Sequence, residues 1–224
     1  VPADAVFWLE NPQASFEISN GFVALGRDAL LNIAIPVTMN NVRYYAESGS
    51  KARSIVLWGQ KHNILDVEIE NVKEGLQSFN AVGGWPLKLN NVEISGADRG
   101  LLSEGKGATL TYFESEGNIM GIHISGSIWP NTFQNPKVTG AIRGTLFTGS
   151  SASNLVINKA NYENNLEGVN FTGSGDLVLS CGKFHNIPGL SQPGNGITIK
   201  GGTVIAADAL NYRAGRVSFA ENKH

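Results

Sequence analysis

The chain has 224 residues, of which 42% are hydrophobic and 8% aromatic, with a formal net charge of −2 and a pI near 6.1. This composition predicts one domain with an aliphatic core, and the charge provides no basic surface for a nucleic-acid partner. The single cysteine, Cys181, excludes an internal disulfide framework and a cysteine-based zinc site, and no apolar run long enough for membrane insertion occurs.

A triplet of the form apolar–any–apolar, followed by a polar residue or glycine, returns along the chain at spacings of about 20 residues. In chain order the motif stands at 16–20, 67–71, 87–91, 155–158, 177–180 and 197–201. The triplets alternate with period two and are rich in β-branched residues, which predicts strands and not repeat helices. Asn-Gly, a typical hairpin signal, is found only at Asn20-Gly21 and Asn195-Gly196, which argues against an antiparallel sandwich. The pattern favours an all-β, right-handed parallel β-helix with about 20–23 residues per coil.

The repeat divides the chain into three parts. Residues 1–13 are expected to form an N-terminal lead-in or cap, residues 14–206 the parallel β-helix, and residues 207–224 a C-terminal cap or a link to a missing domain. One interval between strands is too long, so an insertion is expected within 127–153. The start at Val1, without a secretion signal, suggests a piece of a longer protein.

Asparagine recurs directly after the strands, where a coil must turn sharply. Its side chain tolerates the left-handed backbone conformation and bonds to nearby backbone groups. Stacked coils would place these amides above one another at the strand spacing. We therefore expect an asparagine ladder from Asn20, Asn71, Asn90 or Asn91, and Asn158.

The strand triplets, the coil length and the repeated asparagine resemble the right-handed parallel β-helix of the pectate-lyase-like superfamily. The abundance of Gly, Asn and Ser is most similar to the central domain of phage tailspikes. The resemblance covers roughly residues 14–206 and includes no catalytic signature. The resemblance implies a domain that acts on polysaccharides, and for tailspikes it also implies a trimer. Autotransporter passengers have a similar fold but often lack enzymatic activity.

The middle residue of each triplet is expected to point outward. The early and middle coils present polar residues there, and the late coils present Val156 and Val178. Such an exposed valine strip suggests a cover, either the 127–153 insertion or a neighbouring subunit of a homotrimer.

Carboxylates are concentrated in the middle coils, and glycoside hydrolysis needs two of them at a defined separation. Glu68 is the first candidate, with Glu93 or Asp98 from the next coil as its partner. Glu70 lies two residues along the same outer face. The alternative role of these residues is simply to keep a solvated strand soluble.

Tryptophans supply flat surfaces for sugar rings, and Trp58 and Trp85 flank the carboxylate-rich coil. Lys88 could contact the glycan and, in a lyase, either Lys88 or His123 could serve as the base. No dedicated metal site and no cofactor are expected, because no ligand spacing or phosphate-binding loop is present.

The interpretation is a tailspike- or tail-fibre-like domain on a virion tail or in the extracellular space. It would bind a bacterial surface polysaccharide, and hydrolysis by Glu68 with Glu93 or Asp98 is left open. Two alternatives remain: a non-catalytic scaffold or adhesin, and a polysaccharide lyase or epimerase.

Overall fold

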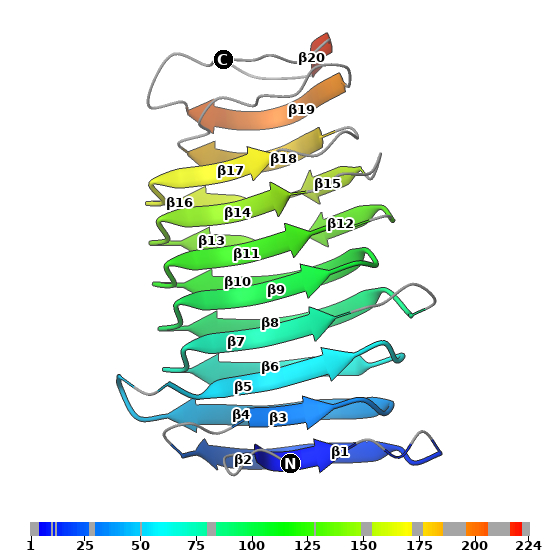
Figure 1. Cartoon of the computed structure of the whole chain (residues 1–224). Helices are drawn as coiled ribbons and strands as arrows, with labels where there is room; N and C mark the ends of the chain where they lie inside the picture. The colour runs from blue at the N-terminus through cyan, green and yellow to red at the C-terminus, as the bar shows by residue number, and fades with distance from the viewer. Residues whose placement is uncertain are drawn as a thin grey trace.

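The computed structural model describes residues 5–9, 11, 13–26, 30–49, 51–79, 84–127, 129–148, 154–171, 177–185, 196–205 and 216–220. All regular elements in these residues are strands, and every pairing between them is parallel. Successive coils rise as a right-handed solenoid, with one sheet running across the front and the other returning behind it (Figure 1). The prediction of an all-β parallel β-helix is therefore confirmed.

The first sheet has eight strands in chain order. They are β1 (Ala5–Leu9), β3 (Leu30–Ile33), β5 (Arg53–Trp58), β7 (Glu74–Phe79), β9 (Arg99–Glu104), β11 (Met120–Ser125), β14 (Arg143–Thr148) and β17 (Glu167–Phe171).

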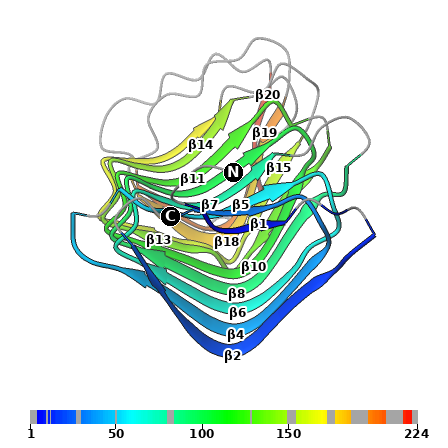
Figure 2. The same cartoon turned by 60° about the horizontal axis from the view of Figure 1, so that its bottom comes forward.

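The second sheet has twelve strands. They are β2 (Phe16–Leu25), β4 (Val37–Ala46), β6 (Asn63–Glu70), β8 (Leu87–Ser95), β10 (Ala108–Glu116), β12 (Asn131–Gln134), β13 (Lys137–Thr139), β15 (Leu155–Asn158), β16 (Asn161–Glu163), β18 (Leu177–His185), β19 (Gly196–Ile205) and β20 (Arg216–Ala220). The long strands bend in the middle, so that the second sheet is V-shaped and the solenoid is roughly triangular in cross-section (Figure 2).

Residues with positive φ mark three corners of the triangle. Corner 1 is the bend of the second sheet and is formed by Asn20, Asn41, Asp66, Asn91, Tyr112, Asn135, Lys159 and Cys181. Corner 2 leads into the first sheet and includes Asn71, Gly96, Gly117, Gly140 and Asn164, whereas corner 3 leads back and includes Gly59, Gly105 and Gly126. Glycine and asparagine dominate because they enter the left-handed region with the least strain.

The asparagine ladder exists as separate pairs at or beside corner 1. Asn41 donates to Asn20 at 2.8 Å, 21 residues away, and Asn91 donates to Asp66 at 2.7 Å, 25 residues away. Asn158 forms the third group, donating to Gln134 and accepting from Ser180. Asn71 belongs to corner 2 instead, because a coil has three turns and the sequence pattern does not distinguish them.

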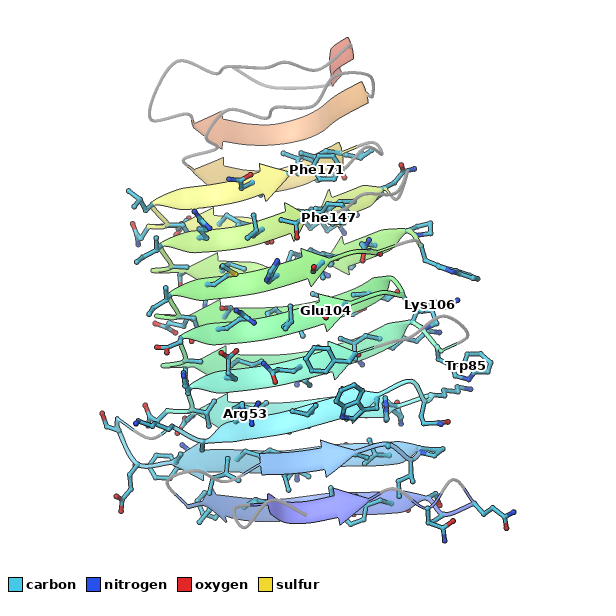
Figure 3. All side chains as sticks on the ribbon, in the orientation of Figure 1. Arg53, Trp85, Glu104, Lys106, Phe147 and Phe171 are labelled. Carbon is cyan, nitrogen blue, oxygen red and sulfur yellow. The ribbon has the colours of Figure 1, made fainter. Side chains whose placement is uncertain are left out.

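The core is a stack of inward-facing aliphatic rows with aromatic rings in the later coils. Phe147 and Phe171 stack at a centroid distance of 4.8 Å (Figure 3). The interior of corner 2 also contains buried amides. Asn118 accepts from the Ala97 N–H at 2.7 Å and donates to the Ile94 carbonyl at 2.8 Å, and Asn165 repeats this arrangement two coils later.

Part of the segment expected to hold an insertion is a regular coil. Strands β12 and β13 pair with β10 on one side and with β15 and β16 on the other, and β14 continues the first sheet. The sequence pattern misses this coil because Asn131-Thr132-Phe133 begins with a polar residue whose side chain is buried. Val156 and Val178 are in register on neighbouring strands and remain partly exposed.

Candidate functional site

Three glutamates form a continuous row on the outer surface between corners 1 and 2. Glu68, Glu93 and Glu114 occupy equivalent positions on β6, β8 and β10, and each is paired in register with the next. Each stands two residues after its corner 1 residue and between two inward-facing neighbours, which forces the carboxylate outward. We call this surface, with Glu70 and Glu116 in the adjacent row, the glutamate face.

Cations bind both ends of the row. The Arg43 Nε lies 3.3 Å from Glu68 Oε2, and the Arg43 Nη2 donates to both Glu70 oxygens at 2.8 Å. The Lys137 Nζ donates to Glu114 Oε2 at 2.9 Å. Within the described part of the chain, no ion pair is made by Glu93, which occupies the middle position.

This asymmetry changes the proton affinity of the central carboxyl group. Partial burial raises the pKa of Glu93 above its ordinary value, and the negative charges of Glu114 and Glu68 raise it further against the opposing effect of Lys137. The hydrogen bond to Glu70 and the charge of Glu68 in turn raise the pKa of Arg43. Glu93 thus keeps its proton to a higher pH than an ordinary glutamate does.

A shallow recess of about 310 Å³ lies beside Glu68 and Glu93 at corner 1. Its other polar walls are the side chains of Asn41, Asp66 and Asn91. Carboxylates and amides together offer the mixture of hydrogen-bond acceptors and donors that sugar hydroxyl groups require.

Exposed aromatic rings border the glutamate face. Tyr112 follows Asn91 at corner 1, has 57% of its surface exposed and adopts φ 51°, a strained conformation for a bulky residue. On the first coils Phe22, 61% exposed, stacks on Tyr45 at 6.5 Å, and Tyr45 is in register with Glu70. Backbone strain at an exposed ring is a pointer to function.

The structure brings together some of the predicted residues and separates others. Glu68, Glu70 and Glu93 lie side by side. Asp98 lies beyond corner 2, where its N–H donates to the Lys73 carbonyl. Lys88 is on the other arm of the second sheet, in register with Thr109.

The two predicted tryptophans also lie away from the glutamates. Trp58 stacks on Phe79 on the first sheet, at a centroid distance of 4.9 Å, and Trp85 projects from corner 3. The reason is topological: a coil turns at three corners, so residues that are close in sequence can lie on different faces of the solenoid.

Sequence reasoning missed Arg43, Lys137 and Tyr112. A usable signal was present, because Asp66, Asn91 and Tyr112 each precede a buried–glutamate–buried triplet. Arg43 in the coil before these three and Lys137 in the coil after them occupy the position of the glutamate. Aligning the coils on the corner 1 residue would have placed all five charges in one row.

In the part of the chain that the structure describes, no three His, Cys, Asp or Glu side chains are placed to hold a metal ion, and no helix could cross a bilayer. No protein-family model, curated protein or solved structure matches the chain.

Proposed function

We propose that the protein binds a bacterial surface polysaccharide on the glutamate face and hydrolyses it there. The observation that carries this proposal is the pair Glu68 and Glu93, in register on adjacent coils beside the recess, with the pKa of Glu93 raised. Two carboxyl groups in different electrostatic environments are the machinery that glycoside hydrolysis requires.

The spacing of the coils suggests the stereochemical course. Adjacent parallel strands lie about 4.8 Å apart, close to the roughly 5–5.5 Å between carboxyl groups in retaining glycosidases. Glu93 would protonate the glycosidic oxygen as its bond to the anomeric carbon breaks, while Glu68 forms a bond to that carbon. Water would then displace Glu68, with Glu93 accepting the proton of the water.

The neighbouring groups have supporting roles in this mechanism. Arg43 would hold Glu68 in place, and the exposed ring of Tyr112 would stack on a sugar bound in the recess. A virion-tail or extracellular location and a homotrimer belong to the same proposal. They are supported by the resemblance of the repeat to tailspikes and by the partly exposed pair Val156 and Val178.

The test is incubation with a panel of capsular and lipopolysaccharide-derived polysaccharides, followed by measurement of chain length. Shortened chains without unsaturated uronate ends support hydrolysis, and chains with the ultraviolet absorbance of such ends indicate a lyase. Binding without shortening indicates an adhesin, for which the ion pairs of Arg43 and Lys137 would be purely structural.

Glu93→Gln is expected to lower the hydrolysis rate by about 10²-fold or more, because it removes the proton donor. Glu163→Gln is the matched control, since this residue is on the same face but later in the stack and paired with Lys183. Full activity of Glu93→Gln would refute the assignment of the site. Light scattering would distinguish a trimer from a monomer.

A further inference from the structure

A second row of chemically specialised side chains lies at corner 3, away from the glutamate face. Lys61, Trp85, Lys106 and Trp129 each stand two residues before the first residue of β6, β8, β10 and β12. These strands are consecutive neighbours in the second sheet, so that cation and indole alternate along the solenoid axis. We call this set the lysine–tryptophan column, and Figure 3 shows Trp85 and Lys106 projecting from the same edge.

Each lysine is positioned by an indole of the next coil. The Lys61 Nζ lies 5.7 Å from the ring centroid of Trp85, and the Lys106 Nζ lies 4.8 Å from that of Trp129. Both distances are typical of cation–π contacts. The two rings are still 55% and 49% exposed, so each pair presents an aromatic surface next to an ammonium group.

The backbone that carries Trp129 is held firmly. The Trp129 carbonyl accepts hydrogen bonds from Ser127 Oγ at 2.9 Å and from Asn131 Nδ2 at 3.0 Å. A side chain at Gly107 would collide with the Pro130 carbonyl, so this coil is seated directly on the one before. Proline follows both tryptophans and restricts their backbone to extended conformations. A ligand would therefore meet rings that need little further ordering.

The charge of this edge is opposite to that of the glutamate face. Lys88, which is exposed, adds a third cation directly after corner 3 to the exposed Lys61 and the partly exposed Lys106. No ion pair to Lys61, Lys88 or Lys106 exists among the described residues, whereas Arg43 and Lys137 on the glutamate face are both paired with carboxylates. The column thus has unneutralised cations beside exposed indoles.

From this arrangement we infer that the lysine–tryptophan column is a non-catalytic binding site for an anionic polysaccharide. The apolar faces of sugar rings would stack on Trp85 and Trp129, and carboxylates of the same chain would bind Lys61, Lys88 and Lys106. The two rings are two coils apart, roughly 10 Å along the axis, so the column offers a repeating site to a repeating polymer. The glutamate face repels such a chain, and the inference is independent of hydrolysis there.

The experiment is electrophoresis of the protein through native gels containing alginate, hyaluronan or polygalacturonate, with dextran as the neutral reference. Retardation by at least one of the three acidic polymers, but not by dextran, is expected, and it should weaken with added salt. The double variant Trp85→Ala/Trp129→Ala should lose about tenfold in affinity, as should Lys61→Gln/Lys106→Gln.

Matched controls are Trp58→Ala, whose indole lies on the first sheet, and Lys73→Gln, an exposed lysine near corner 2. Both should be retarded like the unmodified protein, as should Glu93→Gln, which separates this site from the proposed hydrolysis. No retardation by any acidic polymer, or equal retardation of the double variants, would overturn the inference. So would retardation by single-stranded DNA alone, or a change in mass of the double variants showing that the column joins two copies.

Discussion

The glutamate face and the lysine–tryptophan column are built by the same device and have opposite properties. In both, one position of the coil repeats on neighbouring strands, so that side chains far apart in sequence stand in a row. On the glutamate face, partial burial and the adjoining like charges raise the pKa of Glu93, the central carboxyl group. In the column, cation and ring alternate and stabilise one another. Stacking parallel coils therefore brings equivalent side chains together, and the contact is repulsive on the glutamate face and attractive in the lysine–tryptophan column.

Gly100→Ala should damage both surfaces together. A Cβ at this position would lie 2.6 Å from the Gly121 carbonyl and 2.9 Å from the Asn118 amide, so that the stack itself must shift. We expect a loss of about 4 kcal/mol in the free energy of unfolding, measured by urea denaturation. Gly107→Ala is the contrasting variant: it should displace the Trp129 segment and weaken acidic-polymer binding, while hydrolysis at the glutamate face continues. Equal damage by both variants would contradict this separation.

Acid should lower the free energy of unfolding through His62, the residue that follows Lys61 of the lysine–tryptophan column. Burial lowers the pKa of His62 to about 4, below the ordinary value of 6.5, so the folded state favours the neutral ring. The free energy of unfolding is therefore unaffected by the protonation of His62 above pH 6.5. As the pH falls from 6.5 towards 4, the unfolded state takes up the proton first, and the free energy of unfolding decreases by up to about 3 kcal/mol. In His62→Gln the difference in unfolding free energy between pH 7 and pH 4 should shrink accordingly. Lys61→Gln, its neighbour, should keep the full difference.

Tyr112→Asn should separate stability from function on the glutamate face. Asparagine tolerates the left-handed conformation of corner 1 better than tyrosine, so the free energy of unfolding should rise by about 1 kcal/mol. Loss of the exposed ring should weaken polysaccharide binding at the same time. Asn135→Ala, at the same corner one coil later, should only destabilise. A Tyr112→Asn protein that binds as tightly as before would remove Tyr112 from the site.

The smallest expected effect is a shift in the pH dependence of hydrolysis. Activity requires protonated Glu93, so the rate should fall as the pH rises through its raised pKa. Lys137 lowers that pKa, and Lys137→Met should therefore move the alkaline limb to higher pH. Lys183→Met, whose partner is Glu163, should leave the profile unchanged. An alkaline limb moving to lower pH would contradict the role of Glu93 as the acid.

The sequence alone determined the architecture of this protein. Alternating triplets and polar turn residues at a coil-length period leave little choice except stacked parallel strands, because each coil can bury its apolar side only against the next. The concentration of carboxylates in the middle coils predicted Glu68 with Glu93 or Asp98 as a pair, and the structure places Glu93, not Asp98, in register with Glu68.

Only the tertiary structure decided which side of the solenoid each residue occupies. A coil has three faces, and its length varies from 21 to 25 residues, so small differences in spacing move a side chain around a corner. For this reason Asp98, Lys88, Trp58 and Trp85 lie away from the glutamates, although they are close in sequence. Arg43, Lys137 and Tyr112 reach the glutamate face because stacking, and not proximity along the chain, sets the neighbours of an outward side chain.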